Sequence, residues 1–135
     1  MAGKHSGSCL CGAVRYEITG EFDAFFLCHC RYCQKDSGSA HAANLFSGTA
    51  QLKWLEGEEQ VTLFDLPGTR HSKAFCQTCG SALPHTQMAG KLVVVPAGSL
   101  DSPVSIRPDA HIMLRSKADW DERLDEIEKL DGLPT

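Results

Sequence analysis

Apolar and polar residues alternate along much of this chain with the two-residue period of a half-buried β-strand. Val14, Tyr16 and Ile18 alternate with Arg15 and Glu17, and side chains two residues apart in a strand lie on one face. Turn residues such as Pro67-Gly68 separate the apolar segments. Further strands are predicted at residues 24–27, 41–46, 51–55, 60–66, 69–75, 92–95 and 112–114. Short strands with frequent turns predict a mainly β domain rather than alternating β-α units.

The last twenty residues follow a different period. Apolar residues recur there at helical spacing, and Ser116 stands three residues before Asp119, as in a weak capping box. The apolar positions are Trp120, Leu124, Ile127 and Leu130. We expect a short amphipathic C-terminal helix that docks on the domain and keeps its acidic residues in solvent, in preference to a helix that binds a partner.

Length and charge narrow the class of protein. The chain has 135 residues, which predicts one domain over residues 1–135. Its formal net charge is -4 and its pI is near 5.8, whereas a nucleic-acid backbone requires a basic surface. Nucleic acid is therefore not expected as the main partner. No apolar run approaches the length of a membrane span, so no membrane association is expected.

The cysteines indicate a compartment as well as a chemistry. Residues 1–8 contain no apolar segment of the kind found in signal peptides, so we expect a cytoplasmic protein. In a reducing cytosol, close cysteine pairs are more often metal ligands or redox centres than structural disulfides. All seven cysteines fall in three clusters, namely Cys9 and Cys11, Cys28, Cys30 and Cys33, and Cys76 and Cys79.

The arithmetic of the clusters points to zinc. Two separated pairs together make a closed tetrahedral site with four sulfur ligands, whereas three ligands with an open position are typical of a catalytic zinc site. Four ligands plus three account for every cysteine. Three other interpretations remain: a second site closed by a histidine, a reactive dithiol without metal, and a different combination such as Cys28 and Cys30 with Cys76 and Cys79. The histidines considered as a fourth ligand are His29, His41, His71 and His85.

An open zinc site with three thiolates favours thiol chemistry. The ion lowers the pKa of a bound thiol or water. Three thiolates already place excess negative charge on it, so it activates water poorly and suits another sulfur. The site Cys28, Cys30 and Cys33 is therefore interpreted as a docking point for a thiol.

Three segments resemble the glutathione-dependent formaldehyde-activating enzyme family, which also includes the centromere protein V domain. They are Gly7-Ser8-Cys9-Leu10-Cys11-Gly12-Ala13-Val14-Arg15-Tyr16, Cys28-His29-Cys30-Arg31-Tyr32-Cys33 and Ala74-Phe75-Cys76-Gln77-Thr78-Cys79-Gly80. The resemblance covers a core of about residues 5–115, and the tail, residues 116–135, is similar to the family's ending. Leu10 departs from the family, which often has a histidine at that position.

The resemblance implies a small zinc-bearing domain of folded antiparallel β-sheets. It also implies that Cys9, Cys11, Cys76 and Cys79 bind a structural zinc, and that Cys28, Cys30 and Cys33 bind a second, catalytic zinc. The implied activity is that of a carbon–sulfur lyase, which condenses formaldehyde with glutathione to S-(hydroxymethyl)glutathione or runs the reverse reaction. The expected partners are then a small-molecule thiol and an aldehyde.

Other site residues are less well specified by the sequence. Basic residues near the clusters are candidates for the glutathione carboxylates, namely Arg31, Lys35, Arg70, His71 and Lys73. His41 and His71 are candidate acid–base groups, while His29 is expected to point away from the metal, because neighbouring residues of a strand face opposite sides. The alternative function is a non-catalytic zinc module that binds protein or nucleic acid. A dimer through an exposed strand edge is compatible with the sequence.

Overall fold

The computed structural model describes residues 3–134, and its strands form three sheets. The first sheet, in the order β1-β2-β5, comprises β1 (Lys4–Ser8), β2 (Arg15–Thr19) and β5 (Gln51–Glu56). The second, in the order β11-β3-β4-β10-β9, comprises β11 (Ala110–Ile112), β3 (Ala24–Cys28), β4 (Ala42–Ser47), β10 (Leu92–Pro96) and β9 (His85–Gln87). The third, in the order β6-β7-β8, comprises β6 (Val61–Asp65), β7 (Ser72–Cys76) and β8 (Ala82–Leu83).

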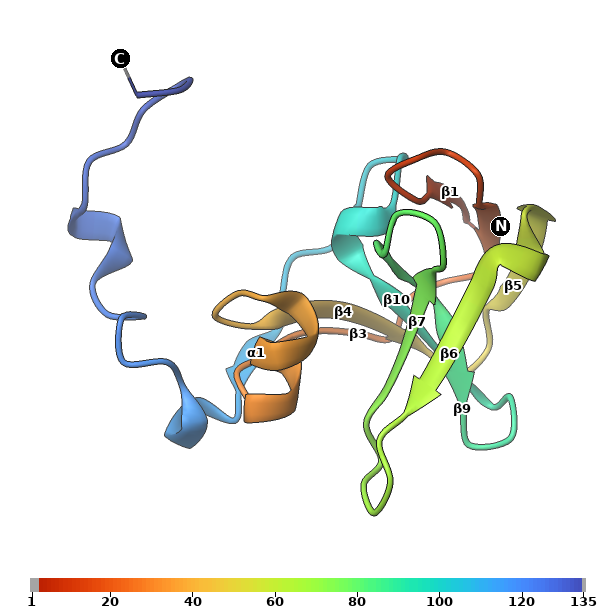
Figure 1. The fold of residues 1–135 in the computed structure, drawn as a ribbon, viewed down its shortest axis with the longest axis horizontal. Helices are drawn as coiled ribbons and strands as arrows, with labels where there is room; N and C mark the ends of the chain where they lie inside the picture. Colours follow the sequence, from red (N-terminus) through yellow and green to blue (C-terminus); the bar gives the residue numbers. More distant parts are fainter. Residues whose placement is uncertain (1–2, 135) are drawn as a thin grey trace.

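The predicted fold class is confirmed. The sheets are antiparallel except where β11 pairs with β3 in parallel, and the three sheets lie around a common centre (Figure 1). Every strand predicted from the alternation has a counterpart within a few residues, whereas β1, β8 and β9 were not predicted. Among residues 3–134, no helix is long and apolar enough to cross a membrane.

The alternation in β2 forms the centre of the core. Val14, Tyr16 and Ile18 are fully buried and pack with residues of the other sheets. Tyr16 lies directly against Gly7 of β1, where a Cβ atom would come within 2.2 Å of the tyrosine ring. Its hydroxyl group is hydrogen-bonded to the Ser99 hydroxyl group at 2.6 Å. The glycine that precedes the first cysteine pair therefore lets the aromatic ring pack beneath β1.

The second sheet has two different faces. Leu45 and Ser47 of β4 are fully buried, and Val93 and Val95 of β10 join Leu45 in the main core. The alternate residues of these strands must face the other side of the sheet. That second face is turned toward β7 and toward the helix, and it carries the candidate site.

The single α-helix among the described residues, α1 (Arg31–Ser37), was not predicted. Cys30 is its N-cap, and the Cys30 sulfur accepts a hydrogen bond from the backbone N–H of Cys33 at 3.3 Å. Gly38 ends the helix in the left-handed conformation with φ of 69°. A seven-residue helix capped by cysteine lacks both the length and the usual capping residues that make a helix recognisable in a sequence.

The predicted C-terminal helix is wrong. The described tail runs away from the sheets as an extended chain (Figure 1), interrupted by single 3-10 turns at Leu114–Ser116 and Leu124–Glu126. Its apolar residues are exposed, Trp120 by 58% and Ile127 by 60%. Short helices gain most of their stability from packing an apolar face, and in residues 117–134 that face is not packed. The helical spacing of apolar residues was therefore insufficient to predict a helix. Two further 3-10 turns lie at Glu58–Gln60 and Ala97–Ser99.

Candidate metal centres and the adjoining cavity

Two distant segments bring four cysteines together. Cys9 and Cys11 follow β1, Cys76 ends β7, and Cys79 lies in the turn after it. Their four sulfur atoms lie within 4.8 Å of one another, with 3.6 Å between Cys9 and Cys11 and 3.9 Å between Cys11 and Cys76. A tetrahedral zinc with bonds of ~2.3 Å requires sulfur–sulfur distances of roughly 3.8 Å. These four residues fit a zinc ion.

Hydrogen bonds shape the two loops around this group. The N–H of Val14 donates a hydrogen bond to the Cys9 sulfur at 3.2 Å. In the second loop, the N–H of Gly80 donates to the Cys76 carbonyl group at 2.7 Å, and Gly80 has φ of 76°, which glycine adopts without strain. Hydrogen bonds from the Ser81 hydroxyl group and backbone lower the pKa of Cys79 to about 5. The loop thus favours a thiolate. Leu10 is 85% exposed, so its side chain is outside this packing.

The second group combines the end of β3 with the start of α1. Cys28 is the last residue of β3, Cys30 caps the helix, and Cys33 lies in its first turn. The three sulfur atoms lie within 4.8 Å of one another, and no further histidine, cysteine or carboxylate among residues 3–134 joins the group. The cysteines therefore divide into four and three. A mixed set of Cys28 and Cys30 with Cys76 and Cys79 is not what the structure contains.

The electrostatics of the three thiols favour a cation. Burial raises the pKa of Cys33, and the neighbouring Cys30 and Cys28 raise it further. Three negative charges at this spacing repel one another unless a cation lies among them. Thiolate ligands and a site of this size fit zinc.

His29 faces away from the three sulfurs. Its side chain is buried, its Nε2 atom is 2.9 Å from Nδ1 of His111, and its Nδ1 atom is 3.2 Å from the Asp121 carboxylate. The orientation agrees with strand alternation. Neither contact was predicted from the sequence. Asp121 belongs to the tail that was expected to be helical. The Asp121 carboxylate and the hydrogen bond from Gln34 Nε2 to the Ser116 carbonyl group, 2.9 Å, tie the start of the tail to the segment that carries the three cysteines.

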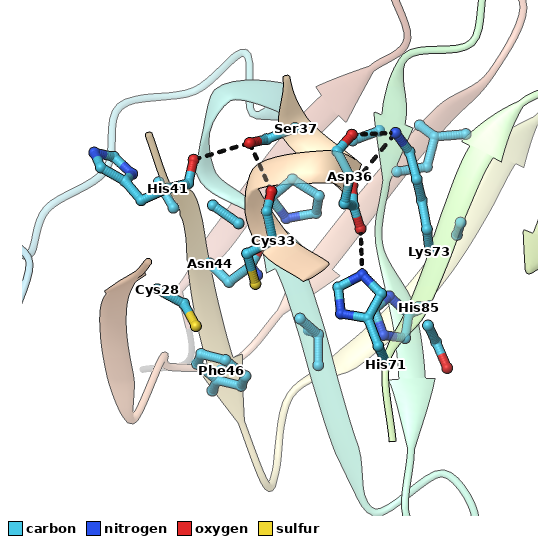
Figure 2. A pocket seen from close by; sticks show the side chains of 18 of the residues that line it. Cys28, Cys33, Asp36, Ser37, His41, Asn44, Phe46, His71, Lys73 and His85 are labelled. Carbon is cyan, nitrogen blue, oxygen red and sulfur yellow. Dashed lines mark hydrogen bonds and ion pairs between the residues drawn. The ribbon is translucent and has the colours of Figure 1, made fainter. Parts of the chain in front are cut away.

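A cavity of about 310 Å³ lies beside the three-cysteine group, between the second face of the sheet, β7 and α1. Figure 2 shows the sulfurs of Cys28 and Cys33 directed toward the same space as the rings of His71 and His85. His41 also lines the cavity. Burial lowers the pKa of both His41 and His85, so these two rings are neutral near pH 7.

One wall of the cavity carries a polar cluster that was only partly predicted. The Nε2 atom of His71 is 2.8 Å from the Asp36 carboxylate, and the Lys73 ammonium group is 3.3 Å from the other carboxylate oxygen (Figure 2). Lys73 also donates a hydrogen bond to the Asp36 carbonyl group at 2.7 Å. Asp36 belongs to α1, Lys73 to β7, and His71 to the loop before β7. Because α1 was not predicted, this contact could not be predicted either.

An open groove of about 830 Å³ also adjoins these cysteines. Six residues line both the groove and the cavity, whereas Cys30 lines the groove alone: Cys28, Cys33, Arg70, His71, Ser72 and Gln87 are shared. Arg31 and Lys35 instead line a separate depression beside the tail. Of the five basic candidates for glutathione binding, the structure therefore brings three to the cysteine group, namely Arg70, His71 and Lys73.

Comparisons with known proteins agree with the family resemblance found in the sequence. The sequence model of the family described as "Glutathione-dependent formaldehyde-activating enzyme" matches residues 4–116. A protein of Halomonas elongata named "Putative glutathione-dependent formaldehyde-activating enzyme" is 34% identical over 126 residues, covering 86% of this chain and 78% of the relative. The crystal structure of a Rhodobacter sphaeroides protein superposes with a TM-score of 0.58 and 25% identity, covering 78% of this chain and 98% of that one. The chain belongs to the glutathione-dependent formaldehyde-activating enzyme family.

Proposed function

We propose that this protein is a zinc-dependent enzyme of the carbon–sulfur lyase type that forms or cleaves the thiol adduct of a small aldehyde, such as S-(hydroxymethyl)glutathione. The observation that carries the proposal is the position of Cys28, Cys30 and Cys33 at the meeting point of a cavity and a groove. A purely structural metal site has no need of such access. In the proposal, Cys9, Cys11, Cys76 and Cys79 hold a structural zinc.

The reaction requires a thiolate and a proton carrier. A thiol adds across the C=O bond: a sulfur–carbon bond forms, the thiol loses its proton, and the carbonyl oxygen gains one. When bound by the three cysteines, zinc would supply an open position that favours a thiolate at neutral pH. The chain itself must then accept the thiol proton and deliver it to the developing oxygen anion.

His71 is the residue best placed to carry this proton. If its Nε2–H donates to the Asp36 carboxylate, its Nδ1 atom is left as a proton acceptor beside the cysteines. Asp36 holds the ring in this tautomer, and Lys73 holds Asp36 from the other side. His71 would take the thiol proton at Nδ1 and return it to the carbonyl oxygen, as general acid–base catalysis requires.

Arg70 is the proposed contact for a carboxylate of glutathione. It lines both hollows beside the cysteines, and a guanidinium group binds a carboxylate with two parallel hydrogen bonds. Arg31 and Lys35 lie in another depression and are left out of the proposed site.

NMR tests the proposal. It measures the rate at which glutathione and ¹³C-formaldehyde interconvert with S-(hydroxymethyl)glutathione, with and without the zinc-loaded protein. The Cys30→Ser variant removes one sulfur but keeps a good helix N-cap, because serine is among the preferred N-cap residues. Wild type and a Ser105→Ala control should accelerate exchange, and Cys30→Ser should lose most of the acceleration. A wild-type protein that leaves the rate unchanged would favour a non-catalytic zinc module.

A further inference from the structure

We propose that the aldehyde handled by this protein is larger than formaldehyde and carries an apolar group that occupies the 310 Å³ cavity. This inference rests on the proposed function, since it names the class of aldehyde for the same site. A cavity of this volume is within the range of ~300–1,000 Å³ found for small-molecule sites. Formaldehyde has only two non-hydrogen atoms, and one water occupies ~30 Å³ in the liquid. Formaldehyde alone would leave most of the cavity unfilled.

The floor of the cavity extends well beyond the cysteines. Ala42 of β4 pairs with Cys28, and Phe46 at the other end of the same face pairs with Val94 of β10. All four residues line the cavity. Ala42 and Phe46 are four residues apart, which corresponds to ~13 Å at ~3.3 Å per residue. The backbone of the floor is therefore long enough for a chain of several carbon atoms or an aromatic ring beside the sulfurs.

The chemistry of the walls favours an apolar occupant. Along the floor, Phe46, Val94, Pro96 and Ile112 are apolar, and the opposite wall contributes Ala74, Ala82 and Leu83. The charged groups that line the cavity are the Asp36, His71 and Lys73 cluster, where Asp36 and Lys73 already pair with each other, and Arg70, which also lines the groove. An apolar group therefore exchanges contact with water for contact with carbon atoms along the floor.

The thiol partner fits the groove better than the cavity. Glutathione carries two carboxylates, one ammonium group and two peptide groups, and burying these among apolar side chains without hydrogen bonds is costly. The groove is open to solvent, and besides Arg70, Ser72 and Gln87, which it shares with the cavity, it offers the polar side chains of Asp65, Thr69 and Thr86. Cys28 and Cys33 lie where the two hollows meet. The peptide part would lie in the groove and the aldehyde substituent in the cavity, so that the new sulfur–carbon bond lies at the junction.

The first test measures binding with stable mimics of the adducts. Calorimetry on the zinc-loaded protein compares S-methyl-, S-butyl- and S-hexylglutathione, in which a thioether replaces the reversible adduct. Burial of a methylene group corresponds to about a fourfold gain in affinity, so S-hexylglutathione should bind at least tenfold more tightly than S-methylglutathione. The same order should appear in the exchange rates of formaldehyde, butanal and hexanal with glutathione.

Two cavity-filling variants link the effect to this cavity. Val94→Phe fills the floor, and Ala82→Leu fills the opposite wall if the first variant fails to fold. Both should reduce the ratio of S-hexyl to S-methyl affinity toward one. Leu55→Phe adds an aromatic ring on β5, at a residue that is 41% exposed and lines neither hollow, and should leave the ratio unchanged.

The outcomes separate this inference from the proposed function. Exchange of formaldehyde without any gain in affinity or rate for longer chains overturns the inference alone. A gain that both filling variants retain also overturns it, because the chain then lies elsewhere. No acceleration with any aldehyde overturns the proposed function and this inference with it.

Discussion

The Nε2 atom of His71 lies 2.8 Å from the carboxylate of Asp36, a residue 35 positions earlier in the chain. The contact joins the only α-helix among residues 3–134 to the loop before β7, and it lies on the wall of the cavity beside Cys28 and Cys33. A carboxylate at this distance favours a proton on the Nε2 atom of the ring. In the proposed mechanism, this contact would orient His71 as the acid–base group.

Replacing Asp36 by asparagine should therefore lower activity much more than stability. We expect a loss of ~10- to 100-fold in kcat/KM for adduct formation, less than the ~10²–10⁴-fold typical of removing an acid–base residue. Glu59→Gln, an exposed neutralisation, is the control. An unchanged kcat/KM in Asp36→Asn would remove His71 from the proposed mechanism.

Gly7→Ala should destabilise the fold through the core. Its Cβ atom would lie 2.2 Å from the Tyr16 ring, so the ring or β1 must move, at a cost of ~1–3 kcal/mol in the free energy of unfolding. Gly98→Ala is the matched control, because a Cβ atom there meets nothing within 4 Å. Chemical denaturation measures both. Equal midpoints for the two variants would contradict the packing described for β1 and β2.

Tyr16 should make stability depend on alkaline pH. Burial raises its pKa to about 12, with a smaller contribution from Asp101 and an opposing one from the Ser99 hydroxyl group. An unfolded tyrosine ionises near pH 10, so its contribution is fully present below pH ~10 and is lost as pH rises toward 12. At pH 8, Tyr16→Phe should be ~1 kcal/mol less stable than the wild type, because it lacks the hydrogen bond to Ser99. Between pH 10 and 12, Tyr16→Phe should lose less stability than the wild type does. A parallel alkaline decline in both proteins would contradict this assignment.

Removing the end of the tail should have little effect on folding. The apolar side chains beyond Asp121 are exposed, as with Ile127 and Leu130, so a chain ending at Asp121 should unfold within ~0.5 kcal/mol of the full protein. A further Asp121→Ala substitution removes the carboxylate that faces buried His29 and should cost ~1–3 kcal/mol. Denaturation curves of the three proteins decide it. A large loss from the truncation alone would mean that the tail packs on the domain.

The features that could be predicted from the sequence are those that depend on residues close together in the chain. Alternation in Val14–Ile18 is sufficient for β2, because one buried face is enough to specify a strand. The cysteine clusters specify candidate metal sites in the same way, since ligands must be close in space and pairs are already close in sequence. What the structure adds is which of the cysteine clusters come together in space.

The remaining features depend on contacts between distant segments. The helix α1 is short and uses Cys30 as its cap, so neither length nor capping residues indicate it. The tail shows the opposite case, where Trp120 and Leu124 follow a helical period without a surface to pack on. The Asp36–His71 pair and the cavity floor arise from strand register and sheet packing. Those are long-range properties that no single segment specifies.

The central claim is that the chain binds two zinc ions. The most direct test is to purify the protein without chelator and to measure the number of zinc ions per chain by elemental mass spectrometry. Wild type is expected to contain two, and Cys30→Ser is expected to contain one while circular dichroism shows the fold retained. One zinc in both proteins would mean that Cys28, Cys30 and Cys33 do not form a stable metal site, and would contradict the proposed mechanism.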